Sequence, residues 1–248
     1  MDLHVATYNI HKGLSAFNRR MMIRELRDRL RDVQPDIVFL QEVQGLHERH
    51  ARRFHDWPDE PHYEFLADSV WPEYAYGRNA VYDHGHHGNA ILSRYPIVSW
   101  ENLDVSSHPF ESRGLLHCQI ELPGVSRTIH CINVHLALNE RGRKRQLGAI
   151  IERVVEIVPD AAPLIVAGDF NDWRNRAGRY LAGELGLHEA FRDDRGRPAR
   201  SFPAALPVRR LDRIYVRGFS IHHAKVHHGH QWAKISDHAM LSARLAFD

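Results

Sequence analysis

The chain has the length and charge balance of an ordinary globular protein. It contains 248 residues, with 33 Lys+Arg against 31 Asp+Glu, and 43% of its residues are hydrophobic. We find no apolar run near the ~20 residues needed to cross a membrane, and no secretory signal at the start. Two cysteines cannot form a disulfide framework. These features exclude a membrane-spanning protein, a disordered tail protein and a disulfide-rich secreted scaffold, and they favour the cytoplasm.

The first half of the chain predicts short strands and one amphipathic helix. Residues 19–33 place apolar side chains on one helical face and six arginines opposite, and Pro35 ends the pattern. Residues 45–82 are rich in aromatics, Pro and His and give no clear assignment. Alternating or continuous apolar runs predict strands at 3–9, 36–42, 89–93 and 97–100.

The second half predicts a hairpin, another helix and several strands. Residues 115–122 and 128–135 form the hairpin, and in its simplest register Cys118 faces Cys131. Residues 139–158 have a continuous apolar helical face. We further expect strands at 163–167, 211–217, 220–227 and 238–245, a short helical stretch within 172–186 and a loop at 192–210.

No repeat or linker divides the sequence, so we predict one domain over residues 1–248. Two main helices are too few for a doubly wound parallel sheet. Many strands with two helices fit an α/β sandwich of two sheets with helices outside.

Histidine is unusually frequent, with 20 residues in the chain, and eight of them cluster at 84–87 and 222–230. The two cysteines lie thirteen positions apart without a CxxC motif, so the usual spacing of a structural zinc site is missing. We expect these histidines in solvated loops and edge strands, and any zinc bound there to be adventitious.

Polar side chains stand at the ends of several predicted strands, where a core would not require them. Strands of one sandwich can bring their ends to a common rim, and convergent carboxylates there suit a hard cation such as Mg²⁺. The residues concerned are Asn9, Glu42, His135, Asp169, Asn171, Asp212, Asp237 and His238.

These residues divide into two chemical groups. Glu42 and Asp237 offer negative oxygens for Mg²⁺, and Asn9 offers a neutral one. Asp169 and Asn171 lie two residues apart, so on extended chain they share one side and suit the orientation of a water and a phosphate oxygen.

A histidine near the end of the chain suits proton transfer. His238 would carry a proton if a carboxylate holds its ring, and Asp212 is the candidate for that role. The general base stays open between Asp169 and His238.

Seven segments carry a family resemblance through their order along the chain. The segments are TYNIHKG (7–13), LQE (40–42), GNAILSR (88–94), NVHL (133–136), GDFN (168–171), LDRIY (211–215) and SDH (236–238). This ordered set spans about residues 3–245 and resembles the endonuclease/exonuclease/phosphatase superfamily. That group includes pancreatic deoxyribonuclease, neutral sphingomyelinases, inositol-polyphosphate 5-phosphatases and tyrosyl-DNA phosphodiesterase.

The resemblance implies a four-layered α/β sandwich, with two packed mixed sheets flanked by helices, and cleavage of a phosphate ester with Mg²⁺ or Mn²⁺. By motif it implies a metal site at Asn9 and Glu42 with Asp237 at or beside the metal. It implies catalytic roles for Asp169 and Asn171 on water and phosphate, for His135 on the scissile phosphate, and for His238 oriented by Asp212. Less directly, it implies substrate-side positions at Asn89 and Arg113.

Three departures narrow the expectation. His11 stands where some DNA-repair members carry a second acid, which argues against a second metal site. His135 replaces a tyrosine-containing segment of abasic-site endonucleases, so that activity is not expected. The segment RLDR at 210–213 replaces the Trp-Cys-Asp-Arg signature of the inositol 5-phosphatases.

The sequence therefore predicts a divalent-metal-dependent hydrolase that cleaves a phosphodiester by in-line attack of an activated water. The substrate would be a nucleic acid, a phospholipid headgroup or a small molecule. The basic residues of 141–145 suit a polynucleotide backbone or simply the solvated start of a helix. The alternative is a non-catalytic metal- or nucleic-acid-binding protein that retains the fold. The sequence leaves the oligomeric state open.

Overall fold

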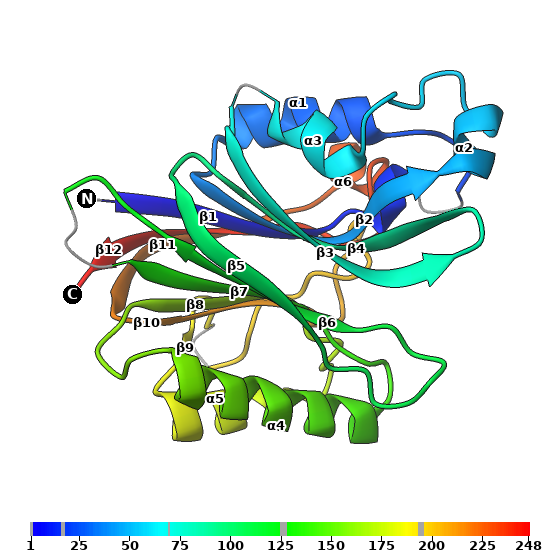
Figure 1. The fold of residues 1–248 in the computed structure, drawn as a ribbon. Helices are drawn as coiled ribbons and strands as arrows, with labels where there is room; N and C mark the ends of the chain where they lie inside the picture. The colour runs from blue at the N-terminus through cyan, green and yellow to red at the C-terminus, as the bar shows by residue number, and fades with distance from the viewer. Residues whose placement is uncertain (1, 16–17, 69, 125–127, 193–195) are drawn as a thin grey trace.

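The structure, a computed structural model, describes residues 2–15, 18–68, 70–124, 128–192 and 196–248. Two six-stranded sheets form its centre (Figure 1). The first contains β1 (Asp2–Asn9), β2 (Ile37–His47), β3 (Glu73–Tyr82), β4 (Gly85–Ser93), β11 (Phe219–His227) and β12 (Met240–Phe247), in the order β11-β12-β1-β2-β4-β3. The second contains β5 (Ile97–Asp104), β6 (Gly114–Ile120), β7 (Ile129–His135), β8 (Leu164–Asp169), β9 (His188–Glu189) and β10 (Asp212–Arg217), in the order β5-β6-β7-β8-β10-β9.

Helices cover the outer face of each sheet, which confirms the predicted four-layered α/β sandwich (Figure 1). The longer ones are α1 (Ile23–Val33), α4 (Glu140–Ile157) and α5 (Ala177–Leu185). The short ones are η1 (His11–Gly13), α2 (Glu48–Arg53), α3 (His62–Ala67) and α6 (His230–Ala233). None of the helices in the described ranges combines the length and apolarity required to span a membrane.

Each sheet contains one parallel pair of strands. β1 pairs with β2 in parallel, and α1 forms the crossover between them. β7 pairs with β8 in parallel, and α4 forms that crossover. A parallel pair requires such a long connection, and a helix that makes it covers the outer face of the sheet. Both sheets are therefore mixed, because the remaining named strand pairs are antiparallel.

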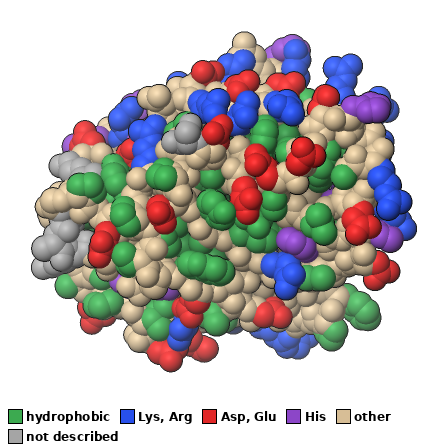
Figure 2. Space-filling view, turned by 45° about the horizontal axis from the view of Figure 1, so that its top comes forward, with side chains coloured by type: hydrophobic (Ala, Val, Ile, Leu, Met, Phe, Trp, Pro, Cys, Tyr) green, Lys and Arg blue, Asp and Glu red, His purple; other side chains and the backbone are tan. Residues whose placement is uncertain are grey.

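The two crossover helices form for recognisable reasons. α1 buries Ile23, Leu26 and Leu30 against β1 and β2, while its arginines face outward as predicted. Figure 2 shows Lys and Arg side chains gathered over this helical layer, where it comes forward at the top. α4 begins after Asn139, whose side chain accepts a hydrogen bond from the Gly142 N–H at 2.7 Å and so satisfies one free donor of the first turn.

The space between the sheets is apolar over most of its depth but polar just below one rim. From β7, Asn133 Nδ2 donates to the carbonyls of Leu40 and Ala90 in the other sheet, both at 2.8 Å. Gln41 Nε2 in turn donates to Asn133 Oδ1 at 2.8 Å. These buried bonds fix how the two sheets face each other beside Glu42 and His135.

Glu42 does not end a strand, contrary to the prediction from residues 36–42. β2 continues to His47 through a register shift between Leu40 and Val43. Glu42 itself has φ 55°, a left-handed conformation that is rare for a residue other than glycine. The irregularity leaves Glu42 half-buried among buried neighbours. A local apolar run carries no signal for such a bulge.

Other boundaries also differ from the sequence expectation. Residues 45–82, left unassigned, contain the end of β2, two short helices and β3. The last strand begins at Met240, so Asp237 and His238 lie in the turn before it. His86 and His87 lie in β4, which has neighbours on both sides and is neither a loop nor an edge strand.

The central part of the second sheet agrees with the sequence expectation. β6 and β7 pair antiparallel, with Cys118 opposite Cys131, which confirms the predicted register. Residues 220–227 fall in β11, which is an edge strand as expected. The predicted short helical stretch within 172–186 is α5.

Candidate active site

The side chain of Asn9 connects the two sheets at their rim. Asn9 ends β1, and its buried amide nitrogen donates to Glu42 Oε1 at 3.3 Å and to Asp169 Oδ2 at 3.1 Å. Asp169 ends β8 of the other sheet. The Asn9 side-chain oxygen accepts the backbone N–H of His11 at 3.1 Å, which fixes the orientation of the amide. Two carboxylates from different sheets are thus held on either side of one amide.

Two histidine rings approach the same oxygen of Asp169. His135, at the end of β7, brings Nε2 to 3.6 Å from Asp169 Oδ2. His238 brings its Nε2 to 3.8 Å from that oxygen. The second oxygen, Asp169 Oδ1, accepts the backbone N–H of Asn171 at 2.9 Å. All of these residues are buried, so Asp169 is the centre of a compact polar cluster.

The opposite nitrogen of His238 is held by Asp212. Their Nδ1 and Oδ2 atoms lie 2.9 Å apart, and Asp212 is completely buried as the first residue of β10. Ser201 Oγ accepts the backbone N–H of Asp212 at 3.1 Å, and the Phe202 ring centroid lies 5.0 Å from that of His238. The loop before β10 therefore packs against both members of the pair.

The cluster has a defined distribution of protons. Burial raises the pKa of Asp169, and the neighbouring Asp212 charge adds to this effect while His238 opposes it. Burial alone would lower the pKa of His238, but the carboxylates of Asp212 and Asp169 outweigh it and raise the pKa. Burial, reinforced by the Arg113 charge, lowers the pKa of His135 well below its usual value. Near neutral pH, His238 is therefore cationic and His135 is neutral.

Asn171 and Asp237 flank this cluster. Asn171 Nδ2 donates to the carbonyl of Leu136 at 3.0 Å, which ties the chain after β8 to the chain after β7. Asp237 Oδ1 lies 3.4 Å from His11 Nδ1, and the preceding Ser236 Oγ donates to the Asn9 carbonyl at 2.7 Å. Asp237 thus stands beside Asn9, on the side of the first sheet.

Asn89 and Arg113 lie beside the cluster, and we observe no hydrogen bond from either to it within the described part of the chain. Asn89 is buried, and its Nδ2 donates to the Gly114 carbonyl at 3.1 Å, which links β4 to β6. Arg113 is half-buried and lines a cavity of about 440 Å³ together with Leu138. Arg113 therefore borders a space that a ligand can enter, while the one hydrogen bond we describe for the Asn89 side chain links the two sheets.

Glu42 and Asp237 offer carboxylate oxygens that suit a hard cation. The Asn9 amide turns its nitrogen toward Glu42 and its oxygen toward the His11 N–H. Asp169, Asp212 and His238 also bring ligand-type atoms within 4.8 Å of one another, the one such group of three found within the described ranges. The carboxylates of Asp212 and Asp169 outweigh burial and raise the pKa of His238, which disfavours that ring as a metal ligand. Glu42, Asn9 and Asp237 stay the predicted ligands of Mg²⁺ or Mn²⁺.

Three supporting residues had no predicted role. Gln41 and Asn133 join the sheets below the site, and both stand within segments already singled out, LQE and NVHL. A buried amide in an apolar strand was a usable signal for such a bridge. Ser201 accepts the N–H groups of Leu211 and Asp212 at 3.3 and 3.1 Å, but a serine in a loop gives no comparable signal.

Comparisons with known proteins agree with this architecture. The family model described as "Endonuclease/Exonuclease/phosphatase family" matches residues 6–238. The protein YbhP of Escherichia coli K12 is 53% identical over 241 residues, covering 97% of this chain and 95% of YbhP.

Two solved structures show the same fold. The endonuclease/exonuclease/phosphatase from Bacteroides vulgatus superposes with a TM-score of 0.76 at 18% identity, covering 100% of both chains. The mannosyl-6-phosphatase Bt3783 of Bacteroides thetaiotaomicron gives a TM-score of 0.71 at 18% identity, covering 99% of this chain and 100% of its own. The chain belongs to the endonuclease/exonuclease/phosphatase family, whose members hydrolyse phosphoester bonds.

Proposed function

We propose that this protein hydrolyses a phosphodiester with the help of Mg²⁺ or Mn²⁺. The observation that carries the proposal is the convergence of His135 and His238 on one oxygen of Asp169, with Asn9 joining that oxygen to Glu42. Titratable groups with perturbed pKa values gather preferentially at functional sites, and phosphoryl transfer depends on positioning and on stabilisation of charge, which such a cluster supplies.

The residues of the second sheet would act on the water and the phosphoryl group. Asp169, fixed by the Asn171 N–H, orients the attacking water, and its raised pKa makes it a stronger base than an ordinary carboxylate. The new P–O bond forms as the bond to the leaving oxygen breaks. The cationic His238 stabilises the negative phosphoryl oxygens, and neutral His135 donates a further hydrogen bond to them.

The residues of the first sheet would supply the ion site. Glu42 and Asp237 would provide negative oxygens, and Asn9 would provide a neutral one after its amide turns its oxygen from the His11 N–H toward the ion. When bound there, the ion neutralises charge on a phosphate oxygen. Asn89 and Arg113 remain our proposed substrate-side residues, and Arg113 has the better access because it lines a cavity.

The test is hydrolysis of bis-p-nitrophenyl phosphate with and without EDTA, followed by addition of Mg²⁺ or Mn²⁺. We expect activity to disappear with the chelator and to return with the metal. Full activity in EDTA would refute the metal requirement. No hydrolysis of any phosphodiester with either metal would favour the non-catalytic binding protein instead. A panel of single- and double-stranded DNA, RNA and sphingomyelin then separates nucleic-acid substrates from phospholipid headgroups.

We also propose that the protein functions in the cytoplasm as one domain. Cys118 and Cys131 lie opposite each other on β6 and β7, and both are free thiols. Two facing thiols that stay reduced are in keeping with a reducing compartment. Quantifying free thiols in protein isolated under alkylating conditions tests this, and a native disulfide would contradict it.

A further inference from the structure

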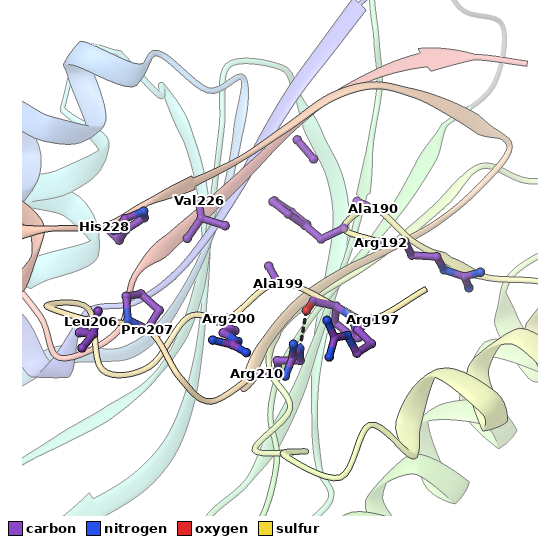
Figure 3. Close-up of a pocket in the computed structure, with 13 residues that line it drawn as sticks. Ala190, Arg192, Arg197, Ala199, Arg200, Leu206, Pro207, Arg210, Val226 and His228 are labelled. Carbon is purple, nitrogen blue, oxygen red and sulfur yellow. Dashed lines mark hydrogen bonds between the residues drawn. The ribbon is translucent and has the colours of Figure 1, made fainter. Parts of the chain in front are cut away.

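A second cavity, outside the candidate active site, opens where the edges of the two sheets approach each other. It measures about 620 Å³. β11, the edge strand of the first sheet, contributes Val226 to one wall. The chain that follows β9, the edge strand of the second sheet, contributes Arg192, and the loop at 196–210 closes the rest (Figure 3). The cavity is therefore built from segments far apart in the sequence.

Its lining is strongly basic. Four arginines line it, and the described lining residues include no acid. Arg210 is held against the wall, since its Nε donates to the Pro198 carbonyl at 2.7 Å (Figure 3). Over residues 190–210 the sequence has six arginines against two aspartates, so the whole segment is cationic. Guanidinium groups bind phosphate through paired N–H donors, which makes a phosphate the matching ligand.

The apolar part of the lining is aliphatic rather than aromatic. Leu206, Pro207 and Val226 face the cavity, and the loop that carries Leu206 leaves that side chain 74% exposed and Val208 54% exposed. Phe191, the one Phe, Tyr or Trp among the described lining residues, is 7% exposed, and the exposed ring of the lining is the small imidazole of His228. Proteins that bind single-stranded nucleic acid stack bases chiefly on accessible aromatic side chains, and this lining presents no accessible Phe, Tyr or Trp. An aliphatic and arginine-rich surface instead matches an amphiphile with an anionic head.

We propose that this cavity and the tip of its loop bind an anionic phospholipid at a membrane surface. The arginines contact the lipid phosphate, while Leu206 and Val208 enter the boundary between headgroups and acyl chains. The binding is peripheral, because it uses surface side chains of one loop and one edge strand. The inference goes beyond the proposed hydrolysis and does not depend on it.

The same loop places the candidate active site next to such a surface. The Phe202 ring packs on the His238 ring at 5.0 Å between centroids, and the Ala204 N–H donates to the Asp237 carbonyl at 2.7 Å. Residues 202–204, which make these contacts, stand in the chain between Arg200 and Leu206, two residues that line the cavity. Docking through Leu206 and Val208 therefore brings the catalytic rim close to the lipid headgroups.

The experiment is co-sedimentation of the full-length protein with vesicles of two compositions, in EDTA to prevent any turnover. One set contains phosphatidylcholine alone, and the other contains equal parts of phosphatidylcholine and phosphatidylglycerol. We expect binding only to the anionic set. The double variant Arg192→Gln/Arg200→Gln should bind about twentyfold or more weakly, since each basic residue near an anionic surface contributes roughly fivefold. Leu206→Ser/Val208→Ser should also weaken binding, with little change in its salt dependence.

A matched pair of charge removals controls for non-specific electrostatics. Arg29→Gln/Arg179→Gln removes two arginines from α1 and α5, in the outer helical layers, and should bind vesicles like the unmodified protein. Equal losses in the two double variants would overturn the proposal, as would equal binding to neutral and anionic vesicles. So would failure to bind vesicles combined with binding of a single-stranded oligonucleotide that Arg192→Gln/Arg200→Gln abolishes.

Soluble glycerol phosphate distinguishes a site for the free headgroup from a site for the lipid surface. The proposal predicts that it competes poorly with vesicles, and full displacement at low concentration would contradict it. Hydrolysis of bis-p-nitrophenyl phosphate by all variants is measured in parallel. Its absence in the unmodified protein would defeat the proposed function and leave the vesicle result to be judged separately.

Discussion

The two sheets contain the same structural unit but end it with different side chains. In the first sheet β1 leads through α1 to the parallel strand β2, and in the second β7 leads through α4 to the parallel strand β8. The first unit presents Asn9 and the half-buried Glu42 at the rim. The second presents His135 and Asp169, both buried and both with shifted pKa values.

This difference shows that the extent of burial can direct the same strand–helix–strand unit toward cation binding in one sheet and toward proton exchange in the other. A carboxylate that keeps contact with water, such as Glu42, suits a cation that retains part of its hydration shell. A carboxylate buried between histidines, such as Asp169, instead holds and exchanges protons. We therefore assign the ion to the first unit and proton chemistry to the second, and the following changes test that division.

A large loss of turnover is expected when either unit loses its central side chain, beginning with the second unit. Asp169→Asn and His238→Ala should each lower kcat on bis-p-nitrophenyl phosphate by about 100- to 10,000-fold, because both act on the same step. The double variant should lose little more than either single variant, since groups that act as a unit are not additive. Steady-state kinetics of the three variants measures this. Simple multiplication of the two losses would show that the residues act independently.

Loss of Glu42 tests the first unit. Glu42→Ala should abolish turnover and weaken the affinity for Mg²⁺ or Mn²⁺, while the fold survives because the side chain is only half-buried. Glu48→Ala, an exposed acid just beyond β2, is the control and should change neither property. Calorimetric titration with Mn²⁺ measures the metal affinity of each variant, and a circular dichroism spectrum shows whether the fold survives. Full activity of Glu42→Ala in EDTA would remove the metal from the mechanism.

A smaller effect is expected from Asp212, which acts through His238. Asp212→Asn should cost less than His238→Ala, about 10- to 100-fold, since it removes only the partner that orients the ring. It should also lower the pKa of His238, because the Asp212 carboxylate raises it. The alkaline limb of the pH–rate profile should therefore move to lower pH. An unshifted profile would mean that Asp212 has a purely structural role.

Much of the candidate active site could be predicted from the sequence, because several of its residues stand at the ends of strands. Asn9, His135 and Asp169 follow apolar runs directly, so a strand prediction places them at a sheet edge. Glu42 was predicted as the end of a strand, and that reason was wrong. It lies in a bulge within β2, and this bulge depends on the pairing of β2 with β4, which a local pattern does not reveal. The bridge between Gln41 and Asn133 depends on which strands of the two sheets face each other, which local patterns do not encode.

The bridge between the sheets provides a prediction for stability. Asn133→Leu keeps the number of side-chain heavy atoms but removes the donor to the Leu40 and Ala90 carbonyls and one of the acceptors of the Gln41 amide. We expect the free energy of unfolding to fall by about 1–3 kcal/mol. Urea denaturation measures it, with KM and kcat of the folded variant recorded alongside. An unchanged unfolding free energy would show that the two units are aligned by other contacts.

The smallest effect lies at the opposite end of β7 from His135. His130 Nδ1 lies 3.0 Å from His117 Nε2, and burial, with the His117 charge, lowers the pKa of His130 to about 4. Because its folded-state pKa is below the usual value, the stability linked to neutral His130 is present above pH ~6.5 and is lost as the pH falls toward 4. Urea unfolding of His130→Leu across this range should show a weaker acid dependence. His188 is exposed, so His188→Leu is the control and should keep the acid dependence of the unfolding free energy. An equal weakening of that dependence in both variants would contradict the role given to His130.

The division between the two units is tested most directly by titrating Mn²⁺ into Glu42→Ala and His238→Ala and measuring kcat for both. The account predicts that Glu42→Ala loses metal affinity and turnover together, while His238→Ala keeps the affinity and loses turnover. Retained affinity in Glu42→Ala with lost affinity in His238→Ala would place the ion among Asp169, Asp212 and His238 and contradict the account.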